Sequence, residues 1–527
     1  MVQSIRITCY LVISSLLFAC CTASSESDLA QKRAKRKRWY SIALEREPGT
    51  LDPRFASSLE EITICSLLNE GLYRVGKDGR PEPGIAESSE LSEDACTYTF
   101  HLRESFWSNG DPLTAGDFER TWRQNLTPKF PAAMGQLLYV ITNAEAVKKG
   151  QLDPSQLAVE ALDPKTLRVR LHHPCPYFTE LLTQPAFFPV HASQQEGVED
   201  LITNGPFVLT RWRTNYELAL TRNYRYWDTA HIQLDSVYLR LVLSDPVTAQ
   251  GMMDTKTMSW IGSPLSTLVD ESIPSFLDKG LVKADPAAAT EFIRANTTRP
   301  VLDNAKFRRA LSYAIDRQPL VEHIIPGGHR VAERFVPPQL STNAMLPSED
   351  AKTMLKEALT ELGYSDTKQL PVLELVYSDC PRRHKIAQFL QDSWRSKLGV
   401  TVKLQRLEPK VHLQRQKALD YDLSIGSWFA DVPDASNFLE IFQSAACPSN
   451  RCGWEDAVYA LTLERAAREL DPAQRKHLLM KAENILLEQQ PIIPLFHNAL
   501  LHVDNEEVGG VVITDTGRLE LRHAHWN

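Results

Sequence analysis

Few residues of this chain stand at spacings that would support catalysis. The sequence contains no Gly-rich phosphate loop, no dinucleotide-binding fingerprint, no His-Glu-x-x-His and no Gly-x-Ser-x-Gly elbow. Its carboxylates form no recognisable pair for acid–base work. The histidines of His172-His173 and His523-Ala524-His525 could hold a metal on a strand, but exposed polar residues at strand ends and chain ends are commoner. We therefore expect no enzyme activity, no metal and no cofactor.

The nine cysteines do not form a regular disulfide framework. Cys447 and Cys452 are the one local pair, and their spacing would suit a small bridged loop in an oxidising compartment. As half of a zinc site this pair lacks a second pair of Cys or His nearby. A disulfide between Cys447 and Cys452 is therefore an open expectation.

The N-terminus has the features of an export signal. Arg6 precedes an uncharged, mostly apolar stretch over residues 7–18, which is as long as a signal-peptide core and too short to span a membrane comfortably. The stretch ends in Leu-Phe-Ala followed by Cys20, which resembles a bacterial lipobox. We expect residues 1–19 to be a signal peptide and Cys20 to be lipidated. An ordinary cleaved signal with incidental cysteines is the alternative.

Charge is distributed unevenly along the chain. Residues 20–38 form a polar tether that ends in a basic run over residues 32–38. Near a membrane each base would add about 1 kcal/mol of attraction to anionic lipid, although a solvated linker explains the run equally well. The chain has a net charge of −8, and the part after residue 38 carries −13. Such an acidic body repels phosphate backbones, so we expect no nucleic-acid partner.

The length of 527 residues predicts about three domains or lobes, at roughly 100–200 residues per domain. Alternating apolar residues predict strands over residues 40–44, 97–102, 158–161, 166–171, 205–210, 216–221 and 235–243. Helical spacing and caps predict helices over residues 58–72, 115–125, 305–325 and 472–488. A strand, a helix and a strand over residues 370–376, 385–397 and 399–406 form a βαβ pattern. This pattern predicts an α/β fold with a partly parallel sheet.

Several motifs follow one another in a fixed order along most of the chain. They are Leu51-Asp52-Pro53, Asn69-Glu70-Gly71-Leu72, Pro83-Gly84-Ile85-Ala86-Glu87-Ser88, Trp107 to Phe118, Asn204-Gly205-Pro206-Phe207, Arg308 to Arg317 and Trp428 to Asp434. Their residue types and order resemble those of one family. It is the large extracellular solute-binding proteins of peptide-type ABC importers, which include oligopeptide- and dipeptide-binding proteins.

This resemblance implies a periplasmic-binding-protein-like fold, with two main lobes joined by a hinge and an inserted third lobe. Lobe I would comprise residues 39–72, 203–285 and 500–527. Lobe II would comprise residues 73–202, and lobe III residues 286–499. A ligand would be enclosed between the lobes when they close.

The resemblance also implies a set of ligand contacts. Asp431 would bind the N-terminal ammonium of a peptide, Trp428 would form a pocket wall beside it, and Ser427 would offer backbone groups. The further contacts implied are Ser58 and Leu59 from lobe I and Tyr139 from lobe II. The peptide would lie extended and pair its backbone with the protein, as a strand added to a sheet does.

The end of the site that would bind the ligand carboxylate departs from the family pattern. Ile425 stands where oligopeptide binders have an arginine six residues before the aspartate, and Tyr377 stands where dipeptide binders have an arginine. Arg383 is the remaining candidate cation for the carboxylate. These departures leave the length of the peptide open.

The function implied is a lipid-anchored receptor of the bacterial cell envelope that captures peptides and delivers them to an ABC transporter permease. Its partners would be the peptide, the permease subunits and, through the lipid, the membrane; the receptor itself would be a monomer. One alternative is a binding protein of the same fold for a metal complex, haem or a sugar. A secreted hydrolase or a chaperone is a second alternative.

Overall fold

The computed structural model describes residues 38–194, 201–241, 251–253, 255, 257–268, 273–341 and 350–527. The expected signal peptide, Cys20 and most of the basic run lie outside these ranges. Within them, no helix combines the length and the apolar character that a membrane crossing requires.

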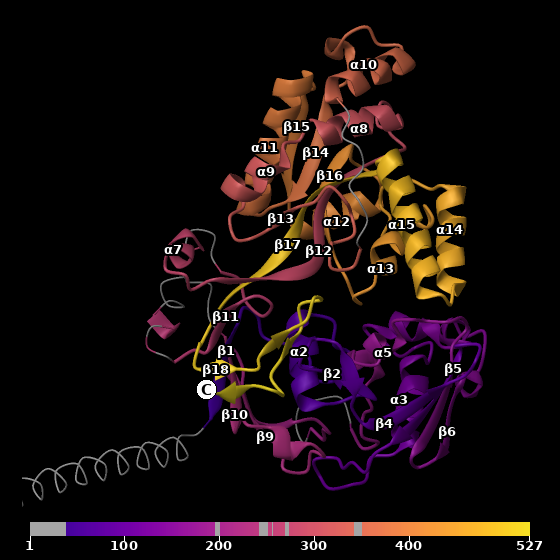
Figure 1. Cartoon of the computed structure of the whole chain (residues 1–527), viewed down its shortest axis with the longest axis vertical. Coiled ribbons are helices and arrows are strands. Elements are labelled where there is room, and N and C mark those ends of the chain that lie inside the picture. Colours follow the sequence, from indigo (N-terminus) through magenta and orange to yellow (C-terminus); the bar gives the residue numbers. More distant parts are fainter. Residues whose placement is uncertain are drawn as a thin grey trace, which may run out of the picture.

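An 11-stranded mixed sheet extends through the larger part of the molecule. Its strand order is β15-β14-β16-β12-β17-β11-β1-β10-β9-β8, and β13 pairs with β17. We call the strands from β11 to β8 the β1 half, which lies at the lower left of Figure 1. These strands are β1 (Trp39–Leu44), β8 (Phe207–Arg213), β9 (Glu217–Arg222), β10 (Ser236–Leu241) and β11 (Trp260–Gly262).

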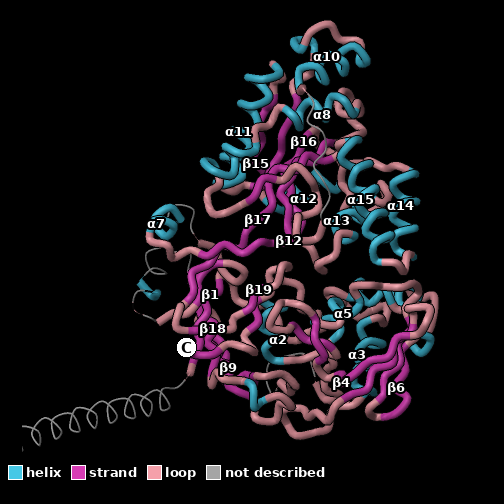
Figure 2. Tube along the Cα trace, viewed as in Figure 1, coloured by secondary structure: helices cyan, strands magenta, loops and turns pink. Residues whose placement is uncertain are grey.

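The other strands of the same sheet form the β14 half, at the top of Figure 1. They are β12 (Lys283–Ala295), β13 (Arg330–Val331), β14 (Leu373–Ser378), β15 (Val402–Leu407), β16 (Leu423–Phe429) and β17 (Ile492–Asp504). Helices pack around them (Figure 2): α8 (Ala305–Tyr313), α10 (Ala351–Leu362), α11 (Pro381–Leu398), α12 (Pro409–Lys417), α13 (Ser436–Leu439), α14 (Ala457–Arg468) and α15 (Pro472–Gln489). The predicted βαβ unit is present, since β14 and β15 pair in parallel and α11 connects them.

Two long strands connect the halves. β12 and β17 pair antiparallel from Lys283 and His502 to Arg294 and Ile492, and β17 continues along β11 of the β1 half. The pairing of β12 with β17 shifts register after Pro286. Proline cannot donate a hydrogen bond to a ladder, so it marks a natural interruption in the sheet. The ladder between the two halves is therefore least regular at this stretch.

A four-stranded antiparallel sheet forms a separate body, which we call the small-sheet region. It lies at the lower right in Figures 1 and 2. Its elements are β4 (Ala86–Leu91), β5 (Thr97–Leu102), β6 (Val159–Asp163), β7 (Thr166–Arg170), α3 (Ala115–Asn125), α4 (Ala144–Lys148) and α5 (Phe178–Leu181). Its own core includes the buried rings of Phe100, Trp107, Phe118, Trp122 and Phe178.

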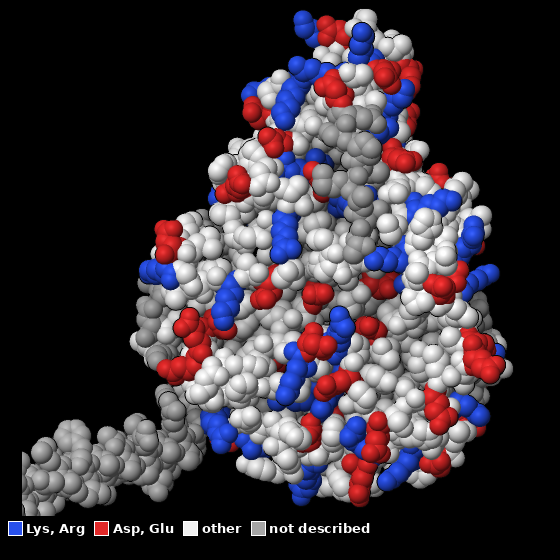
Figure 3. All heavy atoms as spheres, viewed as in Figure 1, with Lys and Arg blue, Asp and Glu red and all other residues white. Residues whose placement is uncertain are grey.

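Shorter elements complete the β1 half and its junction with the small-sheet region. They are α2 (Leu59–Leu68), α7 (Ile273–Asp278), β2 (Tyr73–Val75), β3 (Pro81–Pro83), β18 (Val508–Gly509), β19 (Val512–Ile513), β20 (Leu519–Glu520) and β21 (His525–Trp526). Over the face in Figure 3, acidic and basic side chains are interspersed.

The structure corrects two expectations. The helix predicted over residues 305–325 is broken: α8 ends at Tyr313, and a three-residue helix, α9 (Arg317–Pro319), follows the extended residue Asp316. Pro319 lies near the break. It has no backbone N–H to donate, so it disfavours a continuous helix through this stretch.

Cys447 and Cys452 are both free thiols, and Cys452 Sγ donates to Asn450 Oδ1 over 2.9 Å. The bridge that their spacing suggested is not formed.

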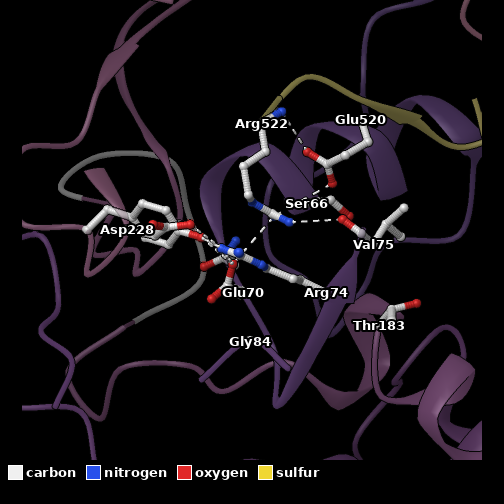
Figure 4. Close-up of polar contacts among 12 residues, drawn as sticks. Ser66, Glu70, Arg74, Val75, Gly84, Thr183, Asp228, Glu520 and Arg522 are labelled. Atoms are coloured by element: carbon white, nitrogen blue, oxygen red, sulfur yellow. Dashed lines mark hydrogen bonds and ion pairs between the residues drawn. The ribbon is translucent and has the colours of Figure 1, made fainter. Parts of the chain in front are cut away.

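The junction of the β1 half with the small-sheet region is built around a buried carboxylate (Figure 4). Glu70 is 1% exposed, and Tyr226 Oη donates to its Oε2 while Trp227 Nε1 donates to Oε1 over 2.6 Å. The guanidinium groups of Arg522 and Arg74 lie 3.5 and 3.9 Å from Oε2. Burial and the neighbouring Glu70 charge raise the pKa of Tyr226 well above its usual value, so this phenol remains a donor.

We expect Arg522→Met to destabilise the protein by about 3–5 kcal/mol, because it leaves buried Glu520 without its cation and removes one of the two guanidinium groups beside buried Glu70. The side chain of Arg522 is 2% exposed, and those of its partners Glu70 and Glu520 are 0% and 2% exposed. The matched control is Arg168→Met, whose ion pair with Glu160 is about half exposed and should be worth less than about 1 kcal/mol. Urea unfolding checks both, and equal losses would contradict the role of burial.

Candidate functional site

The loop that follows β16 lies where the β14 half meets the small-sheet region. The ladder continues one residue beyond β16, since Ala430 N donates to Ala288 O over 2.9 Å. Asp431 comes next, and its carbonyl oxygen accepts from Gln184 Nε2 of the small-sheet region over 3.3 Å. Val432 is 3% exposed and packs within the core of that region. The loop is therefore held by two separate bodies of the molecule.

Asp431 is a carboxylate without a cation. Among the described residues no Lys, Arg or His forms an ion pair with it. Asp431 is an exposed residue, yet surrounding protein atoms partly desolvate its carboxylate. This desolvation raises the pKa of Asp431 above its ordinary value, and a hydrogen bond with the Asn437 side chain opposes the rise. A negatively charged group in this setting is suited to binding a cation from outside the protein.

Asn437 positions Asp431 and also Trp428. Its Oδ1 accepts from Asp431 N over 3.2 Å and from Trp428 Nε1 over 3.1 Å. Trp428 is half-buried and packs against the core between β12 and α15. It lies on the face of β16 opposite to Ser427, because neighbouring residues of a strand alternate. In the structure Trp428 therefore supports the loop through Asn437, which the sequence analysis did not single out.

Ser427 and Phe429 lie on the other face of this strand, and Asp431 follows in the loop beyond its end. Phe429 is 47% exposed, although it is a large aromatic residue. Ser427 stands directly opposite Glu291 of β12 in the ladder, so the two side chains share this face. The accessible face therefore carries an aromatic ring between the Asp431 loop and the polar pair of Ser427 and Glu291.

Arg383 reaches the same face from the first turn of α11. Its Nε lies 3.3 Å from Glu291 Oε1, and its Nη2 donates to Ser427 Oγ over 3.4 Å. Its Nη1 donates to the hydroxyl of Ser378 at the end of β14. The structure thus brings together the predicted residues Arg383 and Ser427 and adds Glu291, which sequence reasoning missed.

The other residues predicted to contact a ligand occupy different places. Ser58 is the N-cap of α2: its Oγ accepts from Glu61 N over 3.2 Å, and its own N–H donates to Glu61 Oε2 over 3.0 Å. Leu59 is half-buried and lies beside Gly517 of the C-terminal segment. Tyr139 lines a groove of about 680 Å³ between the small-sheet region and the β14 half, together with Asn437. Tyr139 and the Asp431 loop therefore border one space.

The positions that depart from the family pattern are both in the core. Ile425 and Tyr377 are each fully buried, and Tyr377 Oη is 2.7 Å from His384 Nδ1. Within the described ranges, no group of three or more His, Cys, Asp or Glu side chains could hold a metal ion. Arg383 therefore remains the cation at this end of the accessible face.

These features define a class of protein. The molecule has two half-sheets joined by long strands, and a third body contacts the loop that carries Asp431. This is the architecture of a periplasmic-type ligand-binding protein. The expected fold class is confirmed.

Comparison with known proteins gives the family. Residues 80–450 match the model of the bacterial extracellular solute-binding proteins, family 5. The chain is 32% identical to the oligopeptide-binding protein OppA of Bacillus subtilis, over 99% of this chain and 98% of that protein. It is also 32% identical to the dipeptide-binding protein DppE of the same organism, over 96% of each. It resembles the unliganded open form of the periplasmic murein tripeptide-binding protein MppA with a TM-score of 0.80 and 28% identity, over 93% of this chain and 98% of that one. The chain belongs to the bacterial extracellular solute-binding proteins, family 5.

We expect Asp431→Asn to make the ligand-free protein more stable than the wild type at pH 7. The raised pKa of Asp431 means that the folded state disfavours the ionised carboxylate. This cost is present above the folded pKa and disappears as pH falls below the ordinary value near 4. Urea unfolding at pH 7 and near pH 4 should show a difference that shrinks on acidification. A wild type that is the more stable protein at pH 7 would contradict this account.

Proposed function

We propose that this protein is a receptor that captures peptides between its lobes and delivers them to the permease of an ABC importer. Its family consists of solute-binding proteins, and two of its relatives are named as oligopeptide- and dipeptide-binding proteins. The observation that carries the proposal is the unpaired, partly desolvated carboxylate of Asp431. A peptide brings the complementary group, a single ammonium at its N-terminus.

The distance along β16 suggests the size of the ligand. Ser427 precedes Asp431 by four residues, so their backbones lie at most about 13 Å apart. Arg383 lies against Ser427, so a ligand that contacts both Asp431 and Arg383 must span about this distance. Three to four extended residues, at about 3.4 Å each, would suffice. We propose peptides of at least this length, with Phe429 as an apolar surface between the two ends.

The division of the chain follows the same proposal. Lobe I comprises residues 39–72, 203–285 and 500–527, lobe II residues 73–202 and lobe III residues 286–499. Ser58 and Leu59 border the ligand from lobe I, and Tyr139 borders it from lobe II. The receptor acts as a monomer without catalysis, at the outer face of the cytoplasmic membrane, and lipid at Cys20 tethers it there.

Asp431→Asn should weaken the binding of peptides with a free N-terminus. Removing one member of a desolvated charge pair costs roughly 2–5 kcal/mol, which corresponds to a loss of about 30-fold to several-thousand-fold in affinity. Isothermal titration with short peptides measures this loss. N-acetylated peptides should bind the wild type poorly and lose little more with the variant.

The matched control is Asp379→Asn, whose carboxylate is exposed and already paired with Arg406. This substitution should leave peptide affinity unchanged. Equal binding of free peptides by the wild type and Asp431→Asn would place the ammonium site elsewhere. If the wild type binds no peptide at all, the proposed ligand class is wrong.

Cys20→Ser should release the protein from the membrane fraction or block its processing, because one lipid-modified cysteine provides the tether. Fractionation of cells and the intact mass of the purified protein report the two effects. The wild type should carry the added mass of the lipid and lack residues 1–19. Unchanged membrane retention together with an unchanged intact mass would contradict lipidation at Cys20.

A further inference from the structure

Within the described part of the chain, Glu291 uses only one of its two carboxylate oxygens. Its Oε1 faces Arg383 Nε at 3.3 Å. Among the described residues, no hydrogen bond reaches its Oε2. The side chain of Glu291 is 9% exposed, and Oε2 is not one of the fully buried polar atoms that lack a partner. This oxygen therefore keeps some contact with solvent, and it can accept a hydrogen bond from a ligand.

Arg383 carries hydrogen-bond donors that the described residues do not use. A guanidinium carries five N–H groups, and those of Arg383 reach Glu291, Ser378 and Ser427. Two N–H groups therefore remain for other partners. The Arg383 side chain is 27% exposed, so these donors are accessible from the interlobe space. Glu291 and Arg383 together offer one acceptor and two donors side by side, with almost no net charge.

This pair lies on the face that carries the proposed ammonium site. Glu291 stands opposite Ser427 in the ladder, and Phe429 stands opposite Ala289, next along the same face. Asp431 follows in the loop, directly after the last ladder bond at Ala430. A ligand that begins at Asp431 and lies over Phe429 reaches Glu291 and Arg383 within about 13 Å.

We propose that Glu291 and Arg383 bind an amide group of the ligand, and that Glu291 disfavours a terminal carboxylate at this point. The inference rests on the proposed function and deepens it. An amide N–H donates to Glu291 Oε2, while its carbonyl oxygen accepts from Arg383. A carboxylate offers no donor and brings a second negative charge beside Glu291. The favoured ligand therefore continues beyond this point as a peptide chain, or ends in a carboxamide.

The test compares alanine tripeptide and tetrapeptide, each as the free acid and as the C-terminal amide, by isothermal titration. Of the two amides, the one that binds the wild type more tightly should bind at least about threefold more tightly than the free acid of the same length. Glu291→Gln keeps the shape of the side chain and removes the charge. It should shift the ratio at least about tenfold toward the acid, which corresponds to one charge-assisted contact.

Glu374→Gln is the matched control, because Glu374 also pairs with an arginine, Arg415, in the β14 half. This variant should keep the wild-type ratio. A wild type that binds the acids as tightly as the amides, or more tightly, would overturn the inference and leave peptide binding intact. An unchanged ratio in Glu291→Gln would assign Glu291 a purely structural role. If the wild type binds neither form, the proposed function fails and this inference fails with it.

Discussion

The buried carboxylate of Glu70 is the interaction that fixes the small-sheet region on the β1 half, and the rest of the structure depends on this junction. Placing an ionised carboxylate in the interior costs several kcal/mol unless cations and donors surround it. The groups around Glu70 come from β2, from the turn after β9 and from the C-terminal tail, as Figure 4 shows for Arg74 and Arg522. The carboxylate is satisfied only when all of these segments are in place. The backbone of Glu70 also exchanges two hydrogen bonds with the side chain of Asn204. One residue therefore fixes the points where the chain leaves for the small-sheet region and where it returns.

This fixed junction contrasts with the connection between the half-sheets. β12 and β17 pass from one half to the other, and their ladder is irregular after Pro286. The ligand contacts that we propose lie largely in the β14 half, at the end of β16 and the start of α11. Asn437 holds the Asp431 loop in the absence of ligand, so less order must be created when a ligand binds. Preorganisation of this kind improves affinity by lowering the cost of association.

Local signals in the sequence were sufficient for much of the fold. The helix predicted over residues 115–125 coincides with α3, because Thr114 and Asp117 form a capping box. The family motifs located the Asp431 loop. The long strands β12 and β17 were not predicted: most of each strand is buried on both faces, so apolar and polar residues do not alternate.

The missed site residues share one property, which is that their partners are remote in sequence or outside any motif. Glu291 is an isolated acid in an apolar run, and only the pairing of β12 with β16 places it beside Ser427 and Arg383. Asn437 lies beyond the motif that ends at Asp434. Ser58 was expected to contact a ligand, but it caps α2, and that role uses its N–H and hydroxyl. Propensity and motif report what a residue prefers locally, whereas these contacts depend on which segments meet.

The place of Val432 gives the small-sheet region a part in ligand capture. This residue is adjacent to Asp431 and is embedded in the core of a body to which it does not belong in sequence. Any movement of the Asp431 carboxylate that shifts the backbone must also disturb the packing around Val432. Close-packed cores resist gradual deformation and change between discrete arrangements. Under the proposed function, the loop would therefore have two discrete positions, with Val432 either packed in the small-sheet region or withdrawn from it, and the rate of withdrawal would limit how fast a ligand leaves.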